Sequence, residues 1–135
     1  MPRFKALAPI IAVTAILALP VAALAHHGWG WTQDEESRLT GTIEEISFGN
    51  PHMQIKLRVA NGRGAANVWN VDLSPPIVAQ GSGFEPGVAS AGDTVILTGH
   101  RARDANVRAF KAETVTVDGR TYNVYPQRER TLRPS

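Results

Sequence analysis

The chain contains no cysteine, and this absence removes several classes of protein at once. A disulfide framework, a thiol nucleophile, a zinc ribbon and a cysteine-ligated cluster all need a residue type that the sequence lacks. Aromatic residues make up only 7% and charged residues 19% of the 135 residues, and no internal repeat is visible. With 43% hydrophobic residues, the composition is that of an ordinary globular protein of one domain.

Sequence motifs that are typical of enzymes are also missing. There is no GxSxG, no HExxH and no phosphate-binding loop. Glu44 and Glu45 are adjacent on an expected strand, where neighbouring side chains point to opposite faces, so they do not form an acid–base pair. We therefore expect a protein that is not an enzyme. A copper oxidase or monooxygenase is the one catalytic alternative, and the chain is short for shaping a substrate site around a metal.

Residues 1–25 have the pattern of an export signal. Arg3 and Lys5 form a positive start, an apolar stretch follows, and residues 23–25 fit a small-x-small cleavage site. The apolar stretch is shorter than the roughly 20 residues that span a bilayer. We predict cleavage after Ala25, export to a periplasm and no membrane span after cleavage. An uncleaved anchor is the alternative.

Removal of this signal changes the charge balance. The precursor has 14 basic and 12 acidic residues, and the signal carries two of the basic ones and no acidic one. The processed chain, residues 26–135, therefore has 12 of each and no formal net charge. Basic residues gather between positions 101 and 111, which would suit nucleic acid or an anionic saccharide on a small barrel. The overall neutrality argues against nucleic acid as a partner.

Alternating hydrophobicity in the processed chain predicts a small β-barrel. Met53, Ile55 and Leu57 alternate with polar residues, as a half-buried strand requires, which places Met53 in the core. A change of parity at Glu44 and Glu45 predicts a bulge in the preceding strand. Strands are expected over residues 39–48, 53–59, 66–73, 93–99, 110–117 and 120–125, with a short helix over residues 74–81.

The order of these elements favours one fold. Three strands, a short helix and two or three further strands are the element order of the OB-fold, a Greek-key barrel with its helix between strands three and four. We predict an all-β, OB-fold-like Greek-key β-barrel of five or six strands; a six-stranded open barrel or a small sandwich is the alternative. The expected parts are an N-terminal arm (26–38), the barrel (39–125) and a polar, loose tail (126–135).

Short segments along the processed chain carry a family resemblance. They are AHH at 25–27, LTGT at 39–42, NPH at 50–52, GHRARD at 99–104 and DGR at 118–120. Together these segments resemble an uncharacterised family of small exported bacterial proteins, domain of unknown function 6152. The resemblance covers essentially the whole processed chain. It implies export and a small β-barrel, and it implies no established activity.

Histidine is the residue type that points to specific chemistry. All four histidines, His26, His27, His52 and His100, lie in the processed chain. After cleavage at Ala25, His26 becomes the first residue, and its α-amine and imidazole Nδ1 form a bidentate chelate for a metal ion. His27 offers a variant, in which the amine, a deprotonated amide and the imidazole of residue two bind together.

A third nitrogen would complete a T-shaped site of three nitrogens. His52 is the favoured third ligand and His100 the reserve. Tetragonal nitrogen sites suit Cu(II), which also heads the divalent affinity order, so copper is favoured over zinc or nickel. The resulting hypothesis is a periplasmic protein of copper handling. In the alternative, the histidines form an exposed start, a turn cap and a surface residue, and the barrel binds an unknown envelope protein or small ligand without metal.

Trp29 and Trp31 flank one glycine just after the first histidines. They either form an exposed aromatic pair that packs over a metal or ligand, or they belong to an arm that folds back and closes one end of the barrel. We favour the second interpretation, because large aromatic residues near a terminus usually anchor it.

Overall fold

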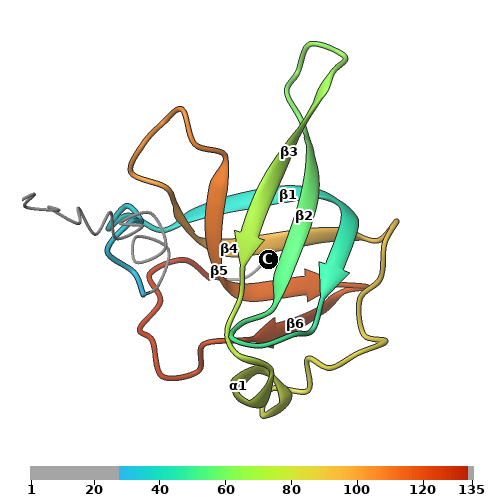
Figure 1. Cartoon of the computed structure of the whole chain (residues 1–135), viewed down its shortest axis with the longest axis vertical. Coiled ribbons are helices and arrows are strands. Elements are labelled where there is room, and N and C mark those ends of the chain that lie inside the picture. The colour runs from blue at the N-terminus through green and yellow to red at the C-terminus, as the bar shows by residue number, and fades with distance from the viewer. Residues whose placement is uncertain (1–27, 134–135) are drawn as a thin grey trace, which may run out of the picture.

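Six strands and one short helix make up the part of the chain that the computed structural model describes, residues 28–133. The helix lies between the third and fourth strands (Figure 1). The elements are β1 (Ser37–Ser47), β2 (Gln54–Ala60), β3 (Ala66–Asp72), α1 (Pro76–Gln80), β4 (Thr94–Arg101), β5 (Ala109–Val117) and β6 (Arg120–Asn123). The predicted order of elements is confirmed, with boundaries shifted by a few residues.

The sheet closes on itself between β3 and β5. Its strand order is β3-β2-β1-β4-β5-β6, and β3 pairs in addition with β5, in parallel. The strands β1, β2, β3, β5 and β4 therefore form a closed five-stranded barrel, and β6 continues as a hairpin from β5. This ring order, with α1 between β3 and β4, is OB-fold-like and confirms the predicted class. The pairing of β3 with β5 excludes an open barrel.

Alternating side chains of the strands fill the interior of the barrel. Ile55 and Leu57 of β2 are at most 1% exposed, while the polar residues between them face solvent. Met53, just before β2, is also a core residue, as predicted. β5 is buried along all nine residues, because it pairs with β3, β4 and β6. Any charged residue on β5 is therefore held away from water.

Two bulges interrupt the pairing of the strands. The register of β1 on β2 shifts between Ile43 and Glu45, which confirms the predicted bulge. A second shift, between Thr98 and Gly99 of β4, lies opposite β5 and was not predicted. β-Bulges re-aim side chains beside the extra residue, and the second bulge does so beside His100.

The chain segments on either side of the barrel pack against it. The arm bonds to the end of β4, where the Gln33 N–H donates to the Arg101 carbonyl oxygen at 2.8 Å. The tail lies against the start of β1, where Arg38 Nη2 donates to the Arg133 carbonyl oxygen at 2.8 Å. The expectation of a loose tail is thus wrong for residues 126–133. Within residues 28–133, no helix is long and apolar enough to cross a membrane.

Candidate metal sites

The bulge between β4 and β5 brings His100 and Glu113 together. Thr98 pairs with Thr114 and Gly99 pairs with Ala112, so Glu113 is the extra residue of β5. Gly99 permits this approach, because a Cβ atom here would collide with the backbone of the facing strand. His100 Nε2 and Glu113 Oε1 consequently lie 3.0 Å apart in the interior.

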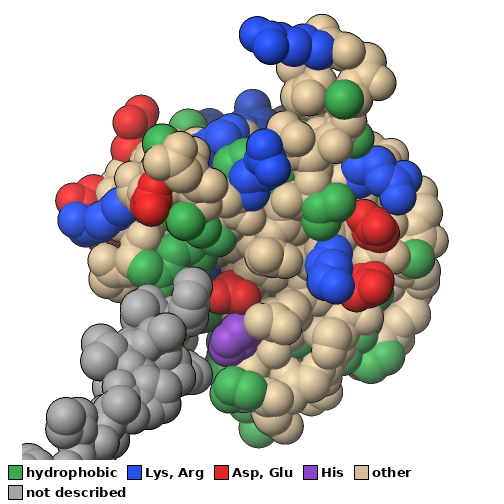
Figure 2. All heavy atoms as spheres, turned by 45° about the horizontal axis from the view of Figure 1, so that its top comes forward, with side chains coloured by type: hydrophobic (Ala, Val, Ile, Leu, Met, Phe, Trp, Pro, Cys, Tyr) green, Lys and Arg blue, Asp and Glu red, His purple; other side chains and the backbone are tan. Residues whose placement is uncertain are grey.

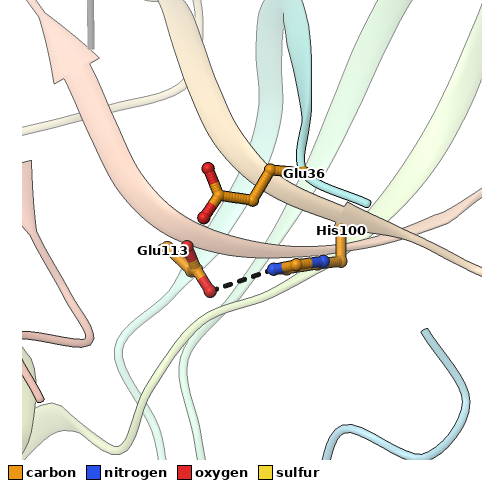
Figure 3. Close-up of side chains that lie close together, drawn as sticks. All are labelled: Glu36, His100 and Glu113. Carbon is orange, nitrogen blue, oxygen red and sulfur yellow. Dashed lines mark hydrogen bonds and ion pairs between the residues drawn. The ribbon is translucent and has the colours of Figure 1, made fainter. Parts of the chain in front are cut away.

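Glu36, at the end of the arm, completes a buried group of three side chains. Ligating atoms of Glu36, His100 and Glu113 all lie within 4.8 Å of one another (Figure 3). The three residues are 9%, 5% and 0% exposed, respectively. One imidazole nitrogen and two carboxylates are ligands that divalent metal ions accept. We call this set the buried triad.

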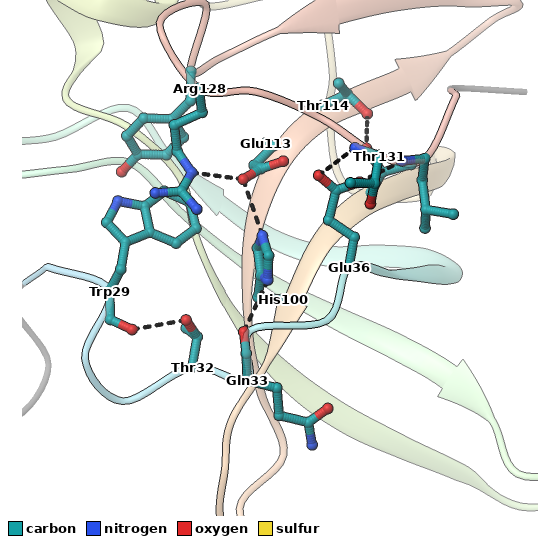
Figure 4. A network of polar contacts seen from close by, with 12 residues as sticks. Trp29, Thr32, Gln33, Glu36, His100, Glu113, Thr114, Arg128 and Thr131 are labelled. Atoms are coloured by element: carbon teal, nitrogen blue, oxygen red, sulfur yellow. Dashed lines mark hydrogen bonds and ion pairs between the residues drawn. The ribbon is translucent and has the colours of Figure 1, made fainter.

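Both ring nitrogens of His100 face acceptors. Nδ1 donates to the Gln33 carbonyl oxygen at 2.9 Å, since that oxygen can only accept. A second hydrogen must therefore lie between Nε2 and the Glu113 carboxyl group. Arg128 Nε also donates to Glu113 Oε1, at 2.7 Å (Figure 4). Glu113 Oε2, by contrast, is buried without a hydrogen-bond partner.

The carboxylate of Glu36 is held by the backbone of the tail. The N–H groups of Thr131 and Leu132 donate to its two oxygens at 2.8 and 2.6 Å. Partial burial raises the pKa of Glu36, but these two backbone hydrogen bonds and one from the Thr131 side chain together outweigh it, and the nearby His100 acts in the same direction. The net pKa of Glu36 is below its ordinary value. Glu36 therefore carries its negative charge at neutral pH.

Trp29 covers the buried triad from the arm. Its ring meets the His100 ring edge-on at 5.5 Å and the Tyr125 ring at 5.0 Å. The Arg128 guanidinium stacks 3.6 Å from the Trp29 ring centroid, and Lys111 Nζ lies 4.7 Å from it. Figure 4 shows the ring beneath Arg128. The arm thus folds back on the barrel, which is the interpretation that the sequence favoured for its tryptophans.

Lys111 and Tyr125 have shifted pKa values beside Trp29. Burial lowers the pKa of Lys111; Asp72 raises it and Arg128 lowers it further. Burial also raises the pKa of Tyr125 to about 12, with Asp72 acting in the same direction and Arg128 in the opposite one. Lys111 Nζ donates to the Gly28 carbonyl oxygen at 2.7 Å, which ties the first described residue of the arm to β5.

His52 lies on another surface, just before β2. Its side chain is 20% exposed, and its Nδ1 lies 3.4 Å from the Met53 carbonyl oxygen and 3.8 Å from Asp72 Oδ1. His52, Asp72 and Trp31 line a hollow of about 240 Å³. Metal-binding histidines usually turn one ring nitrogen to a carbonyl or carboxylate oxygen and ligate through the other. We call this second location the His52 hollow.

The structure describes two of the four histidines predicted as ligands. His26 and His27 lie outside the described residues. Among those described, His100 is grouped with two carboxylates and His52 is not part of that group. His100 is buried, which contradicts the alternative that it is a surface residue. The sequence analysis missed Glu36 and Glu113, since no spacing connects residues that meet only through a bulge and a folded arm.

Fold and sites together define a class: a small OB-fold-like barrel with a candidate metal-binding group. Residues 14–111 match the family of unknown function DUF6152, so the chain belongs to this family, and the resemblance seen in the sequence is confirmed. No curated protein matches the chain. A solved structure that resembles it is the mitochondrial single-stranded DNA-binding protein Rim1 of S. cerevisiae, with 13% identity and a TM-score of 0.48. The match covers 62% of this chain and 92% of that one.

Proposed function

We propose that the protein is exported to the periplasm and binds Cu(II) through its processed N-terminus, in copper handling and without catalysis. The observation that carries this proposal is the orientation of His52. Its Nδ1 faces the Met53 carbonyl oxygen and Asp72, while its Nε2 makes no hydrogen bond or ion pair among the described residues. That nitrogen is therefore ready to serve as the third ligand beside an amine and an imidazole from His26.

The path of the arm supports this choice of ligand. Trp31 of the arm lines the same hollow as His52, and Gly28 is tied to Lys111. Two peptide units separate His26 from Gly28, so their Cα atoms are at most about 7.6 Å apart. His100 is less suited to the same chelate, because both of its ring nitrogens already have partners.

On the face that Figure 2 draws, the surface charge gives no support to a nucleic-acid partner. Figure 2 shows acidic and basic side chains interspersed over one face, without a field of one sign. Ion pairs such as Lys56 with Glu45, at 3.1 Å, neutralise part of this charge locally. Binding of a phosphate backbone depends on a positive patch or stripe. The alternative to copper is therefore an envelope protein or a small ligand.

Cu(II) titration followed by electron paramagnetic resonance tests the proposal. The chain recovered from the periplasm is first weighed by mass spectrometry, which we expect to give a start at His26. We then expect one tightly bound Cu(II) with a nitrogen-rich tetragonal signal. One additional alanine before His26 should change that signal, because the His26 imidazole then no longer belongs to the residue that carries the amine and can bind only together with a deprotonated amide.

Substitution at the barrel tests the third ligand. His52→Ala should weaken Cu(II) binding by about 100-fold. This is the upper end of the loss of affinity that follows when residues around a metal ion are changed. Asn70→Ala is the matched control, since Asn70 lines the same hollow without a metal-binding group. Cu(II) binding that ignores both the additional alanine and His52→Ala would refute the proposal. The search would then turn to an envelope partner.

A further inference from the structure

The carboxylate of Glu113 is unusual because only one of its oxygens has partners. Oε1 accepts from His100 and Arg128, whereas the fully buried Oε2 accepts nothing. The carboxylates of Glu113 and Glu36 also approach each other in the interior (Figure 3). A buried acceptor without a partner costs free energy, and two neighbouring carboxylates repel. A bound cation would relieve both costs.

We infer that Glu36, His100 and Glu113 bind a divalent metal ion of the zinc class. The ligands are His100 Nε2, Glu113 Oε2 and one oxygen of Glu36. This site is separate from the proposed N-terminal copper site and does not depend on it. It uses only side chains of the described barrel, arm and tail.

The contacts around the buried triad are those that hold metal ligands in place. The Gln33 carbonyl oxygen fixes His100 Nδ1–H, which leaves Nε2 directed inward. Arg128 holds Glu113 through Oε1 and leaves Oε2 for the ion. Outer contacts of this kind, from carbonyl oxygens and charged groups to the ligands, orient the ligands of most metal sites.

Glu36 is prepared for the ion in a similar way. Each of its oxygens accepts one backbone N–H from the tail, and the Thr131 side chain adds a third hydrogen bond. The two oxygens of a carboxylate have about four lone-pair sites, so one remains. A metal ion would therefore add to these hydrogen bonds instead of replacing them. The tail in this way holds the ligand that comes from the arm against the ligands that come from the sheet.

Binding exchanges one proton for the metal ion. The hydrogen between His100 Nε2 and Glu113 leaves to solvent, and the nitrogen lone pair then binds the ion. Arg128 keeps its bond to Glu113 Oε1. The donor set of one nitrogen and two oxygens suits zinc, whereas tetragonal Cu(II) sites are richer in nitrogen. The two proposed sites thus differ in the metal that they prefer.

Zinc titration by calorimetry tests the buried site. The protein used is the processed chain with one additional alanine before His26, which separates the amine from the His26 imidazole by one residue and keeps the whole described barrel. We expect it to bind one Zn²⁺. Glu36→Gln should weaken that binding by about tenfold or more, as loss of charge at a ligand requires. Glu35→Gln, at the exposed neighbouring position, should change nothing.

Nuclear magnetic resonance of the histidine rings gives a second readout. Zn²⁺ should shift the ring signals of His100, assigned with His100→Gln, and leave those of His52 unchanged. Failure of the alanine-extended protein to bind Zn²⁺, or equal binding by Glu36→Gln in a folded protein, would overturn the inference. Loss of the copper result alone would leave it standing, because the two experiments address different ligands.

Discussion

His52 and His100 present the same side chain in opposite states. In both, Nδ1 lies near a backbone carbonyl oxygen, and in both a carboxylate is close. At His52 the carboxylate is also on the Nδ1 side, at 3.8 Å, and Nε2 makes no hydrogen bond or ion pair among the described residues. At His100 the carboxylate of Glu113 occupies Nε2, at 3.0 Å. In the two proposals, the nitrogen that the carboxylate faces would therefore decide whether a metal ion could bind directly or would have to displace a proton.

The buried triad and the His52 hollow should differ most in how much their carboxylates contribute to the stability of the fold. Glu113→Ala removes a fully buried partner of Arg128 and His100, and breaking a buried pair costs about 3–5 kcal/mol. Because the Arg128 side chain is 36% exposed, we expect about 3 kcal/mol. Asp72 is the corresponding carboxylate beside His52, and Asp72→Ala should lower the free energy of unfolding by about 1 kcal/mol or less. Urea denaturation measures the loss of stability in both variants. Equal losses would show that the two carboxylates contribute equally to stability.

The bulge that builds the buried triad gives the next largest effect. Gly99→Ala places a methyl group against the backbone of Lys111 and should cost about 2–3 kcal/mol, as overpacking does. It should also shift His100 away from Glu113. Gly30→Ala is the control, because no atom lies within 4 Å of a Cβ atom there. A stable Gly99→Ala protein with unchanged histidine ring signals would show that the bulge is not needed.

The sequence was most informative where local pattern decides structure. Alternation at Met53, Ile55 and Leu57 is visible within one segment of sequence, and the parity change near Glu44 directly marks the bulge of the preceding strand, β1. The pairing of β3 with β5 closes the barrel. It could be predicted from the order of the elements only because that order is the same as in the OB-fold. Local periodicity was therefore enough to predict the strands. Prediction of the topology also needed knowledge of which strand orders form a closed barrel.

The buried triad could not be predicted in the same way. Glu113 lies in a strand where alternation gives no reason for a buried charge, and its place beside His100 results from the register shift between Thr98 and Gly99. Glu36 reaches it only because the arm and the tail fold over the barrel. His100 was a candidate from its residue type alone. Side chains that meet through tertiary packing leave no spacing that a single sequence displays.

The His52 hollow should respond more strongly in metal affinity than in stability. Asp72→Asn keeps the size of the side chain but removes the charge that faces His52 Nδ1. Loss of such an outer partner lowers metal affinity by about 10–100-fold, and we expect the lower end here, because the contact is long. Competition with a copper chelator measures the change. Unchanged affinity would mean that the Met53 carbonyl oxygen alone orients the ring.

The smallest effect is a dependence of stability on alkaline pH, because water screens groups that are only partly buried. The pKa of Tyr125 is raised from 10.0 to about 12, so the unfolded chain loses this proton first. The stability that Tyr125 contributes is present below pH 10 and is lost as the pH rises to about 12. Lys111 acts oppositely: its pKa is lowered from 10.5, so its cost at neutral pH is relieved as the pH rises toward that value.

Asp72 connects this titration to the His52 hollow, since it raises the pKa of both Lys111 and Tyr125. Asp72→Asn should therefore lower both values, and the absorbance change of tyrosinate, with Tyr125→Phe as the blank, measures the second. The decline of stability would still begin near pH 10, the pKa in the unfolded chain, but it would end at a lower pH and so extend over a narrower range. A Tyr125 pKa that stays at about 12 in Asp72→Asn would show that Tyr125, beside Trp29, is electrostatically independent of the His52 hollow. Charge in the His52 hollow would then have no electrostatic influence on Tyr125.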